Sequence, residues 1–584
     1  MPLGSALNSL FLLAQHLDTT KSTTMPVKKT SNDKPLVFPS DEKINFLDRD
    51  IPENHGYTKE YIDSYLNELD SDLSLRINRI MVIKDNKVIG ERYNIPYVQN
   101  SWDCVFSFSK TVVALALGLL YDDGKVDLDL PVYKILKNEK SISVAKNKKI
   151  TLRHLLTMST GITFNEMETA SSLNWTKSYF NSSSKFKFGS KFEYNSLNTY
   201  IISVVVEKLA KKKFGHFIRE RLFDPMGIAS THFDTSPEGF FKGGWGLYIV
   251  PEDMAKLGIL VKDYGVYNGQ QLISKEWIKM MTSKQYPARN FQHAIDYGFQ
   301  IWVDEKNNMC VFNGMYDQNA MIYRSSGVVV ITCCSNNEAF HGGHLFPITA
   351  KYFAKEKMGD FELCKNHGNR IIKNNDNLMY YYDAICNKEY KTVTKISNSC
   401  GILPLLLQNE MGTYAKGIKS VYFKKNDGAY SLVINENHHN YEIKFDFENG
   451  VRQTLSLYGN QFDVVCDAKF ILSGKGEPFL YIKLSFLEFS SIRYFSVKFA
   501  KDMDVLSLEE SENPGFDFVM SIIDVQDEST KTFINRAVKT INPALVSGTI
   551  KNIFAPTFTI IHGEAKINKF LNINKKQPAS NAKK

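Results

Sequence analysis

Residues 111–120 form an almost uninterrupted apolar run, Thr-Val-Val-Ala-Leu-Ala-Leu-Gly-Leu-Leu. Val105 and Phe106 lead into this run, and the turn-forming sequence Asp122-Asp123-Gly124 follows it. An apolar run of this length that ends in turn chemistry predicts a buried helix.

Shorter apolar stretches precede and follow this helix in the first half of the chain. Residues 80–83 and 88–93 flank the polar sequence Lys84-Asp85-Asn86-Lys87 and predict two strands joined by a short turn. Helices are expected at 151–158, 198–209, 217–223 and 346–355, and further strands at 297–303, 310–312, 320–323 and 328–333. Strands at both ends with helices between them predict an α/β (α+β) domain, in which one antiparallel sheet is closed by distant segments around a helical insert.

The pattern changes to strands at regular intervals beyond residue 400. Strands are expected at 420–424, 430–435, 441–447, 453–458, 479–486 and 493–498. Turn signals such as Asn426-Asp427-Gly428 and Asn449-Gly450 separate them. This spacing predicts an all-β domain built as an antiparallel barrel or sandwich.

A chain of 584 residues is too long for one hydrophobic core. We expect a flexible leader at 1–45, a first domain at 46–357, a polar, Asn-rich linker at 358–400, the β-domain at 401–570 and a flexible tail at 571–584.

The composition is that of a folded globular protein, with 43% hydrophobic and 23% charged residues. A net charge of +8 is spread thinly over this length, which argues against a nucleic-acid partner. The chain has eight cysteines and no Cys-x-x-Cys, so reduced thiols are expected. The apolar patch at 7–17 is interrupted by polar residues and lacks a basic flank, so neither a signal peptide nor a membrane span is predicted and a cytoplasmic location follows.

The chemistry of the chain begins with Ser107-Phe108-Ser109-Lys110, at the start of the predicted helix. Residues three apart share a helix face, with Cβ atoms roughly 5–6 Å apart, so Lys110 could take the Ser107 proton once burial favours its neutral form. The unpaired N–H groups of a helix N-terminus would favour the developing negative charge. Ser-x-x-Lys also occurs at 31–34, 40–43, 143–146 and 182–185. The structural alternative for Ser107 is a serine near the cap of an ordinary buried helix.

A series of segments in the same order resembles the class C branch of the serine β-lactamase and penicillin-binding-protein superfamily, which includes esterases and 6-aminohexanoate-dimer hydrolases. The segments are 107–110, 150–161 (Ile-Thr-Leu-Arg-His-Leu-Leu-Thr-Met-Ser-Thr-Gly), 192–199 (Phe-Glu-Tyr-Asn-Ser-Leu-Asn-Thr), 225–228, 243–247 and 297–299. The likeness covers roughly residues 75–355 and implies a β-lactamase/transpeptidase-like fold. It also implies that Ser107 is the nucleophile, that Lys110 is the base for acylation, and that Tyr194 is a second base.

Two motifs depart from the pattern of that family. Tyr-x-Asn is replaced by Tyr194-Asn195-Ser196, so a substrate contact could come from Asn195, Ser196 or Asn198, or be lost. The third motif, Lys-Thr-Gly or His-x-Gly, best matches Phe312-Asn313-Gly314 and lacks its cation. Gly314 permits close backbone approach, and the Met315 N–H is expected to join the Ser107 N–H in an oxyanion hole, with Asn313 a further candidate contact. His341-Gly342-Gly343 imitates this motif but is interpreted as a loop.

The sequence therefore predicts a serine hydrolase of the esterase or amidase type that acts on a small, neutral ester or amide, without metal or organic cofactor, nucleic acid or membrane. His341, His344, His438 and His439 are interpreted as surface histidines. The alternatives are a β-lactamase, a D-amino-acid peptidase or a transpeptidase acting on cell-wall-like substrates, or a catalytically silent binding protein. The oligomeric state and the role of the β-domain stay open.

Overall fold

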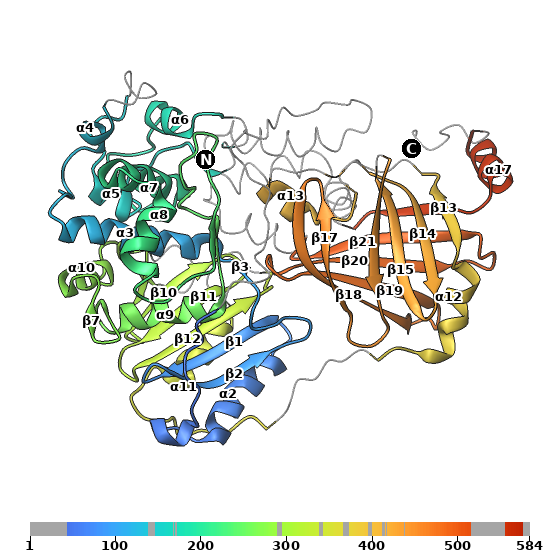
Figure 1. The fold of residues 1–584 in the computed structure, drawn as a ribbon, viewed down its shortest axis with the longest axis horizontal. Coiled ribbons are helices and arrows are strands. Elements are labelled where there is room, and N and C mark those ends of the chain that lie inside the picture. Colours follow the sequence, from blue (N-terminus) through green and yellow to red (C-terminus); the bar gives the residue numbers. More distant parts are fainter. Residues whose placement is uncertain are drawn as a thin grey trace, which may run out of the picture.

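The computed structural model describes the chain in two units that lie side by side along its longest axis (Figure 1). The described residues are 44–137, 146–166, 169, 172–288, 295–337, 343–365, 373–394, 400–411, 415, 417–436, 438–515 and 555–575. The predicted leader lies almost entirely outside this set, as do most of the predicted tail and His341.

A seven-stranded sheet forms the centre of the described part of the first unit, in the order β2-β1-β12-β11-β10-β9-β8. Its strands are β1 (Ile77–Lys84), β2 (Lys87–Tyr93), β8 (Asp296–Tyr297), β9 (Trp302–Asp304), β10 (Met309–Gly314), β11 (Gln318–Tyr323) and β12 (Val328–Cys334). Met81 of β1 pairs with Ile331 of β12 on one side and Glu91 of β2 on the other. The prediction of an antiparallel sheet closed by distant segments is therefore confirmed.

Helices cover both faces of this sheet because residues alternate between the faces along each strand. On β1, Ile80 and Val82 pack in the cluster that contains α2 (Lys59–Ser71) and α11 (Leu345–Phe353). Met81 and Ile83 pack on the other side, in the cluster of α3 (Ser109–Asp122), α7 (Ser196–Ala210) and α9 (Pro251–Lys262). The buried helix predicted at 111–120 is thus α3, whose residues from Ser109 to Leu120 are all buried.

The remaining elements of the first unit connect or extend these layers. The helices and helical turns are η1 (Pro52–His55), η2 (Phe106–Phe108), α4 (Val132–Leu136), α5 (Leu152–Leu156), α6 (Trp175–Asn181), α8 (Phe214–Ile218), η5 (Arg219–Phe223) and α10 (Lys275–Met281). The short strands are β3 (Asp103–Cys104), β4 (Thr231–Phe233), β5 (Leu247–Ile249), β6 (Val266–Tyr267) and β7 (Gln270–Gln271).

A ten-stranded antiparallel sheet forms the second unit in the described residues, in the order β16-β15-β14-β13-β22-β21-β20-β19-β18-β17. Its strands are β13 (Lys388–Thr392), β14 (Ile418–Asn426), β15 (Ala429–Glu436), β16 (His439–Phe445), β17 (Val451–Leu457), β18 (Asn460–Leu472), β19 (Pro478–Phe486), β20 (Ser491–Phe499), β21 (Val505–Asn513) and β22 (Thr557–Ile561). The two edge strands approach each other where Gln453 Nε2 donates to the Lys444 carbonyl oxygen at 2.6 Å. The sheet is therefore a nearly closed barrel, which decides between the two architectures predicted.

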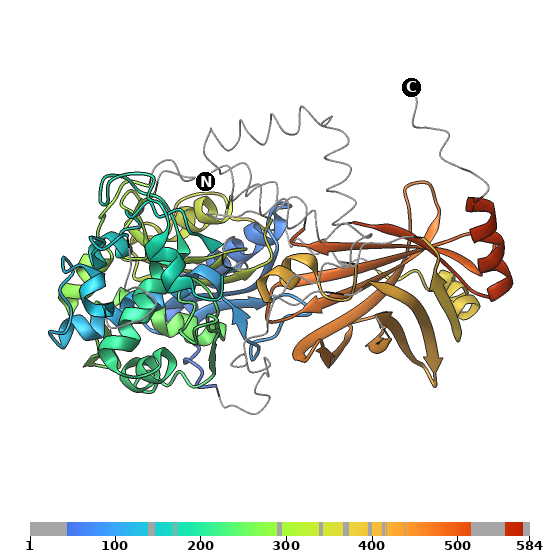
Figure 2. The ribbon, with the colours of Figure 1, turned by 90° about the horizontal axis from the view of Figure 1, so that it is seen from above.

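Helices lie at the ends of this barrel. They are η7 (Asp376–Leu378), α12 (Met379–Ile385), α13 (Leu405–Met411) and α17 (Glu564–Lys575). α13 lies at the side of the barrel that faces the first unit, and α17 at the far side (Figures 1 and 2). β13 and α12 fall within 358–400, so residues of the predicted linker take part in the second unit.

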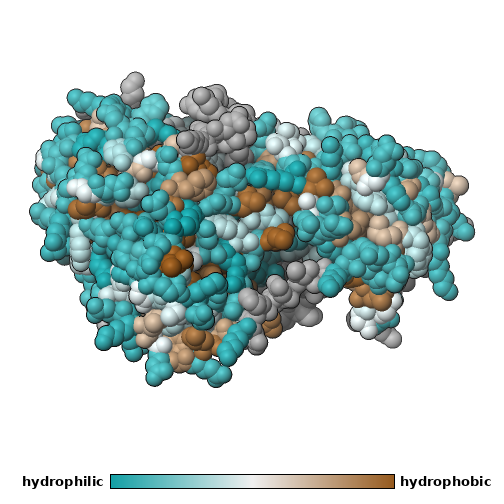
Figure 3. All heavy atoms as spheres, turned by 60° about the horizontal axis from the view of Figure 1, so that its bottom comes forward, coloured by the Kyte–Doolittle hydropathy of each residue, from teal (hydrophilic) through white to brown (hydrophobic). Residues whose placement is uncertain are grey.

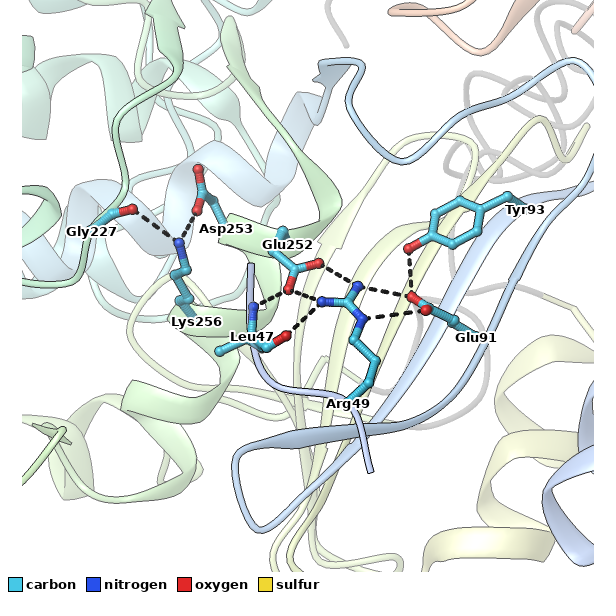
Figure 4. A network of polar contacts seen from close by, with 8 residues as sticks. All are labelled: Leu47, Arg49, Glu91, Tyr93, Gly227, Glu252, Asp253 and Lys256. Carbon is cyan, nitrogen blue, oxygen red and sulfur yellow. Dashed lines mark hydrogen bonds and ion pairs between the residues drawn. The ribbon is translucent and has the colours of Figure 1, made fainter. Parts of the chain in front are cut away.

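A polar network attaches the first described residues to the sheet and to α9 (Figure 4). The Arg49 guanidinium donates to Glu252 of α9 at 2.8 and 3.0 Å and pairs with Glu91 of β2 at 2.9 Å. The neighbouring Lys256 donates to Asp253 at 2.6 Å, and burial raises the pKa of Asp253 to about 6. Glu252 is fully buried, so the ion pair with Arg49 supplies the partner that its charge requires.

The described residues contain no disulfide cross-link, and the face drawn in Figure 3 has only small apolar regions. All eight cysteines are free thiols, six of them buried. The face drawn in Figure 3 is mainly hydrophilic, with small groups of apolar side chains. Across the described residues, no helix combines the length and apolar character needed to cross a membrane. The same residues contain no cluster of three metal-ligating side chains, and His344, His438 and His439 are exposed.

Candidate active site

Ser107 lies in the 3-10 turn η2, which runs directly into α3. Lys110, one helical turn further on, is 1% exposed. Its Nζ donates to Ser107 Oγ at 2.8 Å and to the Gly244 carbonyl oxygen at 2.7 Å. The structure therefore brings the predicted nucleophile and base into direct contact at a helix N-terminus, as their spacing indicates.

Tyr194 approaches the same hydroxyl from the segment before α7, and a hydrogen bond joins its phenol to Ser107. Lys110 Nζ lies 4.8 Å from the centroid of the Tyr194 ring. The Tyr194 ring also stacks on Trp302, with centroids 5.7 Å apart and an interplanar angle of 15°. Burial raises the pKa of Tyr194 well above 10, and the Ser107 hydrogen bond offsets only part of that rise. In this arrangement Tyr194 is a neutral phenol rather than a phenolate.

The end of β10 forms the opposite edge of the site. A Cβ at Gly314 would lie 2.2 Å from the Val105 carbonyl oxygen, so only glycine allows this close approach to the segment before Ser107. Met315 follows directly and begins the turn to β11. Phe312 is fully buried, with its ring 4.8 Å from that of Phe108. An aromatic contact thus stands where the family pattern has a cation.

Asn313, Asn195 and Asn198 all have structural partners. Asn313 Nδ2 donates to Asn319 Oδ1 at 2.7 Å. Asn195 caps α7 through the Leu197 N–H, and its Nδ2 donates to two backbone carbonyls at 2.9 Å. Asn198 is fully buried and accepts from Thr160 at 2.8 Å. The amide groups of these three residues therefore form hydrogen bonds within the protein around the site.

Ser196 is also buried, and its backbone N–H donates to Glu166 Oε1 at 2.9 Å. The Glu166 carboxylate lies close enough to Tyr194 to contribute to its raised pKa. No motif in the sequence points to Glu166, because its relation to Tyr194 arises only when two loops come together.

Gly244 is the second residue of the site whose part could not be assigned from sequence. It belongs to the quoted segment 243–247, but its relevant group is the backbone carbonyl that accepts from Lys110. A Cβ on Gly244 would lie 2.6 Å from both Cβ and the carbonyl oxygen of Ser196. Glycine therefore lets this carbonyl approach Lys110 Nζ next to the start of α7.

Comparison with known proteins shows what the first unit is similar to. Residues 79–343 match the family model described as Beta-lactamase. A 6-aminohexanoate-dimer hydrolase of Paenarthrobacter ureafaciens is 23% identical over 221 residues, which are 34% of this chain and 55% of that protein. The present chain thus spans about half the length of this curated relative.

Solved structures with related names align with about half of the chain. A penicillin-binding protein homologue from Caulobacter crescentus aligns with a TM-score of 0.44 and 15% identity, covering 53% of this chain and 100% of that one. A D-amino acid amidase from Ochrobactrum anthropi aligns with a TM-score of 0.39 and 15% identity, covering 50% and 98%.

The antiparallel sheet, the helical insert and the Ser-x-x-Lys turn at the start of α3 define the class of β-lactamase/transpeptidase-like domains. Over residues 79–343, the first unit of this chain is similar to the β-lactamase family whose model it matches.

Proposed function

We propose that this protein is a serine hydrolase that cleaves a small, neutral ester or amide through an acyl-enzyme on Ser107. The observation that carries the proposal is the contact of one hydroxyl with two titratable groups. Ser107 Oγ lies 2.8 Å from Lys110 Nζ and is hydrogen-bonded to Tyr194. A nucleophile, a base and a proton donor in mutual contact are the groups that acyl transfer needs.

Acylation begins when neutral Lys110 takes the Ser107 proton as Oγ attacks the carbonyl carbon of the substrate. The oxyanion that forms accepts hydrogen bonds from the N–H groups of Ser107 and Met315. The neutral Tyr194 phenol then donates its proton to the leaving oxygen or nitrogen and recovers one from Lys110. In deacylation a water molecule attacks the acyl-enzyme ester, and its proton passes through Tyr194 and Lys110 to Ser107 Oγ. The bond between Oγ and the acyl group breaks, and the carboxylic acid leaves.

The side chains around the site favour an uncharged acyl group. Phe312 offers no cation to a substrate carboxylate, and the Glu166 carboxylate near Tyr194 would repel one. The family relative named above carries a hydrolase name that refers to an amide substrate. A β-lactamase, D-amino-acid peptidase or transpeptidase must bind the carboxylate of its substrate, and Phe312 and Glu166 do not favour such binding. The cytoplasmic location expected from the sequence stays a prediction.

The test is hydrolysis of a short-chain p-nitrophenyl ester by the wild type and by three variants, Ser107→Ala, Lys110→Ala and Tyr194→Phe. We expect no turnover with Ser107→Ala and a fall of about 10²–10⁴-fold with Lys110→Ala, the usual contribution of a general base. Tyr194→Phe keeps the ring beside Trp302 and removes only the proton donor. Ser182→Ala, in another Ser-x-x-Lys sequence, is the matched control and should retain wild-type turnover.

Two outcomes would count against the proposal. Turnover that persists in Ser107→Ala would exclude Ser107 as the nucleophile, and an inactive wild type would favour the silent binding protein. Rapid acylation by penicillin would instead support the β-lactamase or transpeptidase alternative.

A further inference from the structure

A turn of the second unit reaches into the first unit directly behind the Ser107 segment. This turn, residues 487–490, joins β19 to β20. The backbone N–H of Cys104 in β3 donates to the Glu488 carbonyl oxygen at 2.6 Å. Arg79 Nη2 of β1 donates to the Leu487 carbonyl oxygen at 3.4 Å. The barrel therefore supplies hydrogen-bond partners to the strand that ends three residues before the nucleophile.

Buried polar groups reinforce this junction. Arg79 forms an ion pair with Asp103, and both side chains are fully buried. Ser490 Oγ donates to Asp103 Oδ1 at 3.5 Å, and Asn78 Nδ2 donates to Ser490 Oγ at 3.1 Å. A buried ion pair is tolerated only when further hydrogen bonds satisfy its atoms. The turn provides some of those bonds, so Asp103 depends on the second unit for its surroundings.

Aromatic packing holds β3 from the same side. The ring of Phe489 lies 5.6 Å from that of Tyr248, in an edge-to-face arrangement. Tyr248 belongs to β5 and pairs with Cys104 of β3. The next residue, Val105, donates its N–H to the Leu247 carbonyl oxygen at 3.0 Å. β3 is thus held between β5 and the turn at 487–490.

Two strained residues flank the candidate oxyanion hole and belong to the same apolar cluster. Phe106, directly before Ser107, has φ +44°, and Tyr316, directly after Met315, has φ +64°. Their rings meet edge to face at 5.2 Å. Both lie in one cluster with Trp102, Cys104, Phe489 and the interior of the barrel. Such backbone conformations cost free energy and persist only where the surroundings over-determine them.

From these contacts we infer that the second unit is a positioning element of the active site. The turn at 487–490, and Phe489 above all, holds β3, Phe106 and hence Ser107 in the geometry that reaches Lys110. Phe489 is a positioning residue, since its ring packs against Tyr248 and Phe462 and acts on Ser107 through β3. The inference rests on the proposed function for its kinetic consequence, because a displacement of about 1 Å at a nucleophile can cost roughly 10² in rate.

The experiment compares Phe489→Ala with Phe445→Ala in the full chain. Phe445 is an equally buried phenylalanine of the barrel, on β16. The limiting rate at which a serine-reactive fluorophosphonate probe phosphonylates Ser107, with loss of fluoride, is measured at saturation, under conditions in which unfolding curves show both variants folded. We expect at least a tenfold fall for Phe489→Ala, little change for Phe445→Ala, and recovery of most of the rate in Phe489→Leu.

A second readout does not need activity. Amide hydrogen exchange over residues 102–108 should become faster in Phe489→Ala and stay unchanged in Phe445→Ala. If Phe489→Ala fails to fold, Ser490→Ala removes the Asp103 hydrogen bond with the ring left in place, and the same two effects are expected.

The inference is overturned if Phe489→Ala keeps both the wild-type phosphonylation rate and wild-type exchange, or if Phe445→Ala changes them equally. A wild type that the probe leaves unlabelled contradicts the proposed function instead. Faster exchange confined to the variants at the turn would then still support the structural coupling.

Discussion

Two glycines determine how closely the backbone surrounds Ser107 and Lys110. Gly314 lets β10 approach the Val105 carbonyl, and Gly244 lets its own carbonyl accept from Lys110 beside Ser196. In both places a Cβ would overlap with backbone atoms, which cannot move aside as a flexible side chain can. The geometry of the site therefore depends on glycine at positions 244 and 314 as well as on the side chains of Ser107, Lys110 and Tyr194.

Gly314→Ala tests this dependence. The new Cβ would lie 2.2 Å from the Val105 carbonyl oxygen, so β10 and the Met315 N–H must move away from Ser107. We expect kcat to fall by about 10²–10³-fold, the loss that accompanies removal of one oxyanion-hole donor. Gly474→Ala is the control, because no atom lies within 4 Å of its Cβ position. Wild-type kcat in Gly314→Ala would contradict the assignment of this strand to the oxyanion hole.

At the scale of the element, the segment at 400–411 is fixed to the barrel by buried charges. Glutamates accept its backbone N–H groups: Glu436 from Ile402 at 2.7 Å and Glu512 from Leu405 at 2.7 Å. Glu510 accepts more weakly from Gly401, at 3.3 Å. Arg493 lies among these carboxylates, 3.1 Å from Glu512. The barrel thus supplies acceptors for backbone N–H groups of this segment that would otherwise be buried without a partner in water.

Glu510 makes the attachment of this segment sensitive to pH. Burial raises the pKa of Glu510 from 4.5 to about 8, although Arg493 opposes the rise. Between these two values the folded protein holds a proton that the unfolded chain has lost. Its contribution to stability is therefore fully present below pH 4.5 and is lost as the pH rises through 8.

Glu510→Gln removes this titration. The free energy of unfolding of the variant, relative to the wild type, should increase as the pH rises from about 5 to about 9 in urea titrations. Glu509→Gln, at a partly exposed neighbour on β21, is the control and should follow the wild type at every pH. A difference between Glu510→Gln and the wild type that is independent of pH would show that Glu510 is ionised in the folded protein.

At the scale of the whole molecule, the two units share one apolar cluster and a buried polar junction. Residues of the first unit, among them Phe106, Tyr248 and Tyr316, pack in the cluster that fills the barrel. Asn513 Nδ2 of β21 donates to the Ser335 carbonyl oxygen at 3.1 Å, which adds a further link. Separation would expose both surfaces to water, so neither unit is expected to be stable alone.

Unfolding should therefore be cooperative across the chain. All five tryptophans, at 102, 175, 245, 277 and 302, lie in the first unit, so their fluorescence reports on that unit. Far-UV circular dichroism reports on both units, including the ten-stranded sheet. We expect coincident transitions by the two probes in a urea titration. A fluorescence transition clearly separated from the circular dichroism transition would contradict the shared core.

Local sequence patterns predicted many of the helices and strands, but they could not predict contacts between segments far apart in the chain. The helix at 111–120, the hairpin at 80–93 and the contact of Ser107 with Lys110 follow from periodicity and spacing. β18, β21 and β22 were not predicted, and neither was the approach of Glu488 to Cys104. The latter joins residues far apart in the chain through backbone groups, which leave no mark in the sequence. Asn195 and Asn198 were candidate substrate contacts because they lie close to Tyr194 in the sequence. In the structure Asn195 caps α7 and Asn198 is buried in the core, and the sequence cannot distinguish these roles of an asparagine from substrate binding.

The proposed mechanism requires that Ser107 form a covalent bond with the substrate. The most direct measurement is the intact mass of the wild type and of Ser107→Ala after treatment with a fluorophosphonate probe, followed by peptide mapping. We expect one stoichiometric adduct on Ser107 in the folded wild type and none in the variant. No adduct in the wild type, or the same adduct in Ser107→Ala, would contradict it.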